Sequence, residues 1–127
     1  MRQCRHGFAA PRVLVIEDEA LIASVTAETL SDEGYEVRTA ADGCAALQLV
    51  TDWWPCLILL DILLPVMDGH AFLRELWRLD DRARTPVVLV SGAGGPMLSG
   101  VSVRVADVIH KPFNLDRVVA VADRLAR

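Results

Sequence analysis

An aliphatic run interrupted by a single carboxylate is the feature that most constrains this sequence. Leu57 to Leu60 precede Asp61, and the segment Pro-Val-Met-Asp-Gly follows at residues 65–69. Such a run is typical of a strand buried on both faces, as in a parallel sheet covered by helices. Asp61 falls where that strand should end, and a carboxylate that loses solvent needs a cation or hydrogen-bond donors. The run therefore predicts a parallel sheet with an acid at a strand end that requires a partner.

Strand-like and helix-like segments alternate along the rest of the chain, which indicates an α/β domain. Strands are predicted at residues 12–16, 35–40, 57–60, 87–90 and 103–109. Helices are predicted at 20–33, at 42–53 with Asp42 as N-cap, at about 68–79, and at 114–125 with Asn114 as N-cap. Four glycines between residues 92 and 100 each cost about 1 kcal/mol in a helix interior, so a fourth helix there should be irregular or short. Five βα units of this kind form a doubly wound five-stranded parallel sheet.

Side chains that can bind ions or take part in reactions follow four of the five predicted strands. They are Glu17, Asp18 and Glu19 after the first strand, Asp61 after the third, Ser91 after the fourth and Lys111 after the fifth. Ligands of doubly wound sheets bind beyond the carboxyl ends of the strands. Lys111 is the one lysine among 13 lysine and arginine residues, and it falls at this edge. The pattern predicts a single site there.

Composition excludes several other classes. A length of 127 residues and a net charge of -4 with dispersed acidic residues favour one domain and argue against direct binding of nucleic acid. Residues 1–11 are expected to be a leader without a signal sequence, and the longest apolar stretch, 56–67, is too short and interrupted for a membrane span. Three cysteines without metal-ligand spacing predict free thiols in a reducing compartment. We expect a cytoplasmic protein that does not enter a membrane.

Four short motifs resemble the receiver domain of two-component response regulators, the CheY-like superfamily. They are Val-Ile-Glu-Asp-Glu at 15–19, Leu-Leu-Asp-Ile-Leu-Leu-Pro-Val-Met-Asp-Gly at 59–69, Val-Ser-Gly at 90–92 and Lys-Pro-Phe at 111–113. Each is weak alone, but together, in order and at predicted strand ends, they are specific. The resemblance covers residues 12–127 as one receiver domain and implies a (βα)5 flavodoxin-like fold with strand order 2-1-3-4-5.

The resemblance implies a role for each strand-end residue. Asp61 would accept a phosphoryl group from a kinase phosphohistidine. Mg²⁺ would be held by Asp18, Asp61 and the backbone carbonyl of Leu63, with Glu17 as an inner or outer ligand. Lys111 and Ser91 would contact phosphoryl oxygens. Lys111-Pro112 resembles the cis peptide bond of the family.

Two departures from the family pattern bear on the switch. Glu17 stands where the family more often has aspartate, which leaves the strength of Mg²⁺ binding open. Val108 stands where an aromatic residue commonly swings inward on phosphorylation, so that rotamer switch cannot operate. A modified route is expected, such as ordering of the glycine-rich segment.

The expected partners are a histidine kinase or phosphotransfer protein and a downstream protein. The chain would not be a turnover enzyme, and it would be a single-domain regulator unless it is part of a longer protein; its oligomeric state is open. One alternative is a degenerate receiver that binds partners without phosphorylation. Another is an aspartate-dependent phosphatase, but its second catalytic aspartate would be expected at position 63, which is Leu63.

Overall fold

The computed structural model describes residues 10–62, 69–79, 85–92, 105–111 and 114–127. Five parallel strands form one sheet in the order β2-β1-β3-β4-β5. In chain order the elements are β1 (Arg12–Ile16), α1 (Ala20–Asp32), β2 (Glu36–Ala40), α2 (Gly43–Trp53), β3 (Leu57–Asp61), α3 (Gly69–Leu79), β4 (Val87–Ser91), β5 (Asp107–His110) and α4 (Leu115–Ala126). The predicted doubly wound fold and its strand order are confirmed.

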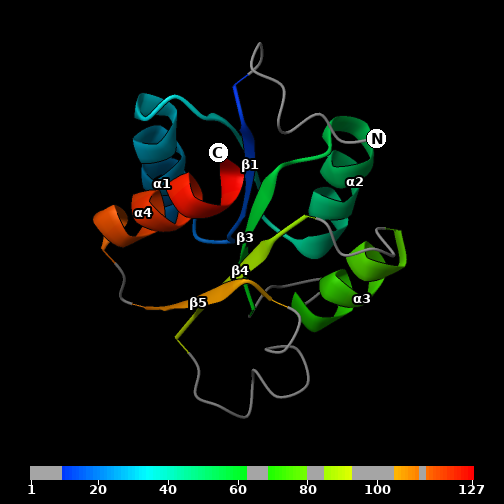
Figure 1. Cartoon of the computed structure of the whole chain (residues 1–127). Coiled ribbons are helices and arrows are strands. Elements are labelled where there is room, and N and C mark those ends of the chain that lie inside the picture. Colours follow the sequence, from blue (N-terminus) through cyan, green and yellow to red (C-terminus); the bar gives the residue numbers. More distant parts are fainter. Residues whose placement is uncertain (1–9, 63–68, 80–84, 93–104, 112–113) are drawn as a thin grey trace.

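Helices cover both faces of the sheet, with α1 and α4 on one side and α2 and α3 on the other (Figure 1). All five residues of β3 are buried. Ile58 and Leu60 pack into the core on the α2–α3 side, whereas Leu57 and Leu59 pack into the core on the α1–α4 side. This alternation follows from the two-residue period of a strand. It explains why an uninterrupted aliphatic run was needed at the centre of the sheet.

Two helices begin at the N-cap residues that the sequence predicted. The Asp42 carboxylate accepts a hydrogen bond from Ala45 N at 2.9 Å, and Asn114 Oδ1 accepts one from Arg117 N at 2.8 Å. Gly34, just beyond α1, has a φ of 99°, which glycine adopts without steric cost. Both predicted N-caps are therefore confirmed.

The last strand begins later than predicted. β5 starts at Asp107, and Val105 and Ala106 form a bend instead of strand. Asp107 is paired with Val88, and Ala106 N donates to the carbonyl of Val87, the first residue of β4. Because β4 begins there, Val105 has no strand residue beside it to pair with. Residues 103–104, the start of the predicted strand, lie outside the described residues. The glycine-rich segment expected to hold a fourth helix lies outside the described residues apart from Gly92.

The cysteine prediction is partly wrong. Cys44 is a free, exposed thiol, but Cys56 is disulfide-bonded. The spacing of cysteines along the chain does not show which sulfur atoms the fold brings together. The cysteines therefore no longer support the inference of a reducing compartment. Within the described ranges, none of the helices has the length and apolar character needed to cross a bilayer.

Candidate functional site

The sheet brings the predicted residues to one edge. β3 and β4 are paired with Asp61 opposite Val90, and β4 and β5 with Ser91 opposite His110. Lys111 N donates to the Ser91 carbonyl at 2.9 Å, which joins the ends of β4 and β5. Parallel pairing thus places the ends of β3, β4 and β5 side by side, as the sequence predicted.

Lys111 connects two acidic side chains. Its Nζ lies 3.0 Å from Glu17 Oε1 and 3.1 Å from Asp61 Oδ2. The Lys111 side chain is 22% exposed, while those of Glu17 and Asp61 are 4% and 9% exposed. Solvent therefore screens these ion pairs less than pairs on an open surface.

Three carboxylates gather around this lysine. Glu17, Asp18 and Asp61 each offer an oxygen atom within 4.8 Å of the others, and Asp18 is the exposed member. One ammonium cannot balance three carboxylates, so the cluster retains negative charge. Hard oxygen ligands that carry excess negative charge suit Mg²⁺, which also keeps part of its water shell. The donor set therefore fits the ion, although Leu63, the fourth predicted ligand, lies outside the described residues.

Burial and pairing oppose each other in the electrostatics of this site. Loss of solvent, together with the charge of Asp61, raises the pKa of Glu17 despite hydrogen bonds from Lys111 and Glu19. Burial alone would lower the pKa of Lys111, but its contacts with Glu17 and Asp61 outweigh that effect and raise it. Lys111 consequently stays charged in the site.

Ser91 is completely buried at the carboxyl end of β4. Its contact with a phosphoryl oxygen stays a prediction. Val108 is half-buried and packs against the core on the α2–α3 side. A valine there confirms only that β5 carries no aromatic side chain at this position. Pro112 and its peptide bond to Lys111 lie beyond the described ranges.

Sequence reasoning missed two structural features of the site. It assigned Glu17 to the metal alone, whereas the structure pairs it with Lys111. It also treated Gly69 only as part of a motif, whereas a Cβ there would lie 2.8 Å from backbone atoms of Ile62. The greater length of glutamate relative to aspartate could have suggested the first contact; the second depends on tertiary packing.

A cavity of about 670 Å³ opens beside the cluster. Its wall includes Glu17 and Asp18, together with residues of α1, of β2 and of the β2–α2 connection. Asp18 therefore faces space accessible to a ligand or solvent, whereas Asp61 is not among the residues that line this cavity.

Comparison with known proteins agrees with this arrangement. The response regulator receiver domain family matches residues 13–123. Transcriptional regulatory protein PrrA of Mycobacterium leprae is 33% identical over 121 residues, an alignment that covers 95% of this chain and 52% of PrrA. Nitrogen assimilation regulatory protein NtrX of Azorhizobium caulinodans is 37% identical over 116 residues, covering 88% of this chain and 25% of NtrX. The chain thus spans about half the length of PrrA, and less of NtrX.

Solved structures give the same result. The receiver domain of NtrX from Brucella abortus superposes with a TM-score of 0.80 at 40% identity, covering 90% of this chain and 97% of that one. Chemotaxis response regulator CheY4 of Vibrio cholerae gives 0.82 at 29% identity, covering 92% and 99%. Since PrrA is named a transcriptional regulator, the expectation that this chain does not act on nucleic acid stays a prediction. The family match over nearly the whole chain, with the strand order and site described above, establishes that this chain belongs to the response regulator receiver domain family.

Proposed function

We propose that Asp61 is the phosphoacceptor of a His-Asp phosphorelay. The observation that carries this proposal is the contact of the chain's one lysine with a buried carboxylate at the carboxyl edge of the sheet, 3.1 Å from Nζ to Oδ2. A buried aspartate beside a cation and a second acidic group has the surroundings that phosphoryl transfer onto a carboxylate requires.

In the proposed step, an Asp61 oxygen attacks the phosphorus of a phosphohistidine. A phosphorus–oxygen bond forms, the phosphorus–nitrogen bond breaks, and its electron pair returns to the imidazole. Lys111 neutralises phosphoryl charge, and Ser91 donates a hydrogen bond to a phosphoryl oxygen. Asp18 and Asp61, with Glu17 nearby and the Leu63 carbonyl, would hold Mg²⁺, which would supply positive charge that offsets the charge of the transferring phosphoryl group.

The phosphoryl donor would be a histidine kinase or phosphotransfer protein, and the product would bind a downstream protein. Phosphorylation shifts an existing conformational equilibrium instead of creating a new state. Because residue 108 is valine, this shift does not use an aromatic side chain at that position. We propose that the output of this receiver is a contact with the downstream protein.

Intact mass after incubation with acetyl phosphate tests the proposal. Wild type with Mg²⁺ should gain one phosphoryl group, and wild type without Mg²⁺ should gain much less. Asp61→Asn should gain none, because an amide oxygen is a poor nucleophile. Asp116→Asn is the matched control, since Asp116 lies in the first turn of α4, and it should be modified like wild type.

A second candidate is a phosphorylation-independent binding module. The mutual pairing of Lys111 with Glu17 and Asp61 favours it, because the network is already partnered without a phosphoryl group. Absence of an adduct with acetyl phosphate and with histidine kinases would support this candidate. An adduct on wild type that Asp61→Asn lacks would reject it.

A further inference from the structure

The Glu17 carboxylate uses both of its oxygens on donors from this chain. Oε1 pairs with Lys111 Nζ at 3.0 Å, and Oε2 accepts from the Glu19 backbone N–H at 3.2 Å. The Glu17 N–H itself donates to the Ala40 carbonyl of β2 at 2.9 Å. Glu17 is thus fixed at both its backbone and its side chain, and it faces Lys111.

The contact depends on the length of the glutamate. Aspartate at this position would hold its carboxylate about 1.5 Å closer to the backbone, the length of one carbon–carbon bond. The backbone cannot follow easily, because it is tied to Ala40. A shorter acid would therefore lose or weaken the Lys111 contact while keeping the same charge.

A phosphoryl group on Asp61 would also need the Lys111 ammonium to neutralise the charge on its oxygens. An ammonium is a compact charge whose donors turn toward the strongest acceptors. New phosphoryl oxygens would compete with Glu17 Oε1 for it. Any Glu17–Lys111 attraction that weakens on phosphorylation stabilises the unphosphorylated state relative to the phosphorylated one.

We propose that Glu17 is a positioning residue that holds Lys111 in the unphosphorylated protein and thereby opposes phosphorylation of Asp61. This inference rests on the phosphoacceptor role proposed above for Asp61. It assigns to Glu17 a function separate from metal binding: it sets how readily the lysine becomes available.

The unphosphorylated half of the inference can be tested without any phosphodonor. Because the chain has one lysine, protein labelled with ¹⁵N-lysine gives a single side-chain ammonium signal. In metal-free Glu17→Asp that signal should shift, and its protons should exchange faster with water than in wild type. Glu36→Asp is the matched control, because Glu36 is shortened in the same way but pairs with Arg12 at 3.6 Å. An identical Lys111 signal in wild type and Glu17→Asp would overturn the inference.

The second measurement is the rate of phosphorylation by acetyl phosphate, followed by intact mass at Mg²⁺ concentrations that saturate each protein. Glu17→Asp should react about fivefold faster than wild type, the order expected when a charge-assisted hydrogen bond is lost from the starting state. Glu36→Asp should match wild type. An equal or slower rate in Glu17→Asp overturns this inference alone. If none of the three proteins gains an adduct, either with acetyl phosphate or with histidine kinases, the proposed function is overturned and the inference with it.

Discussion

Gly69 shows how one residue shapes the segment that follows the acceptor strand. Its N–H donates to the Ile62 carbonyl at 3.1 Å, directly after Asp61. A Cβ at this position would come within 2.8 Å of both Ile62 Cα and Ile62 O. The start of α3 can therefore approach the end of β3 this closely only because the residue has no side chain.

Replacing Gly69 by alanine should destabilise the fold by about 1–3 kcal/mol, because backbone atoms must move to relieve the overlap. Urea unfolding of Gly69→Ala and wild type measures the difference. Gly92→Ala is the matched control, since among the described residues a Cβ there would meet Lys111 Cβ alone, at 3.8 Å, which is an ordinary contact. Equal midpoints for Gly69→Ala and wild type would show that the overlap is relieved without cost.

Single residues also mark the limit of what the sequence revealed about the site. Strand-end placement predicted that Asp61, Ser91 and Lys111 would meet, because parallel strands present their carboxyl ends together. The pairing of Glu17 with Lys111 was not predicted, because side-chain reach depends on how far the first and fifth strand ends are separated across the sheet. Asp18 and Glu17 look equivalent as neighbouring acids, yet one is exposed and the other buried.

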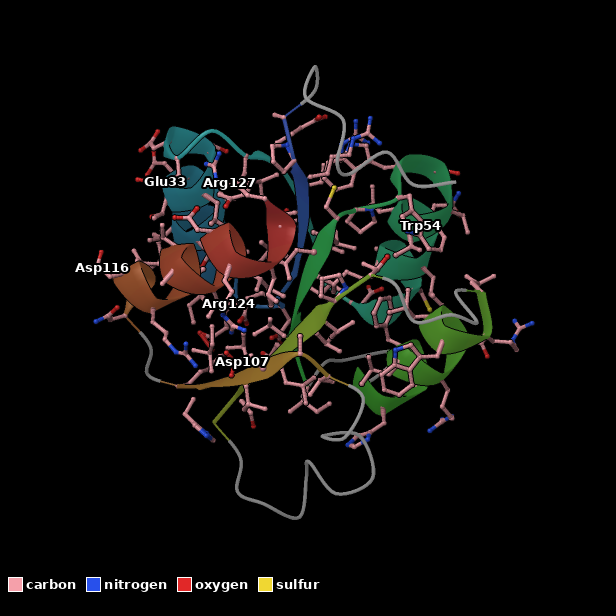
Figure 2. All side chains as sticks on the ribbon, in the orientation of Figure 1. Glu33, Trp54, Asp107, Asp116, Arg124 and Arg127 are labelled. Atoms are coloured by element: carbon pink, nitrogen blue, oxygen red, sulfur yellow. The ribbon has the colours of Figure 1, made fainter. Side chains whose placement is uncertain are left out.

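Among the elements, α4 is held against its neighbours by charged side chains along its length and just beyond its last turn. Arg117 and Arg124 contact the Asp107 carboxylate at 3.3 Å and 2.6 Å, and Figure 2 shows Arg124 directed toward Asp107 at the start of β5. Arg127, beyond the last turn, donates to the Glu33 carbonyl and to Tyr35 Oη. The helix is thus tied to β5 and to the turn between α1 and β2.

Tyr35 is the buried member of this terminal cluster and gives it a pH dependence. Its hydroxyl donates to Asp123 Oδ1 at 2.6 Å, and burial together with that carboxylate raises the pKa of Tyr35 to about 12. The folded state therefore keeps the proton between pH 10 and 12, where the unfolded chain loses it. This stabilisation is complete below about pH 10 and is lost as the pH rises toward 12.

Tyr35→Phe should lower the free energy of unfolding by about 1 kcal/mol near neutral pH, because a hydrogen bond to a carboxylate is lost. The difference between wild type and Tyr35→Phe should shrink as the pH rises from 10 to 12. Denaturant unfolding at pH 8 and pH 11 measures both values. A difference that stays constant over this range would contradict the raised pKa.

Element boundaries were predictable where a local signal fixes them. Asp42 and Asn114 cap their helices as expected, and β1 has the predicted bounds. The start of β5 was not predictable, since it depends on where β4 begins and not on the valines before Asp107. Trp53 is 5% exposed, and the arginines that stack on it, Arg12 and Arg38, come from β1 and β2. Such contacts are invisible in the local sequence.

At the scale of the whole molecule, the strand order connects the acidic cluster to folding. β1 and β3 are neighbours at the centre of the sheet, so Glu17 and Asp18 at the end of one lie beside Asp61 at the end of the other. Pairing of β1 with β3 therefore brings three negatively charged side chains together. Among the described residues of the site, Lys111 is the cation that offsets their charge. Folding and cation binding should be coupled, because the unfolded chain does not assemble this cluster.

Mg²⁺ should therefore raise the stability of the wild-type domain. A ligand that binds only the folded state adds RT ln(1 + [L]/Kd), or about 1.4 kcal/mol at ten times Kd. Thermal unfolding at rising MgCl₂ should show a matching increase in Tm, and EDTA should reverse it. Asp18→Asn should lose most of the increase, because it replaces the exposed carboxylate of the cluster with a neutral amide. NaCl at equal ionic strength is the control for general screening. If NaCl produced the same increase, or Asp18→Asn kept it in full, the stabilisation would come from screening and not from an ion held by Asp18 and Asp61.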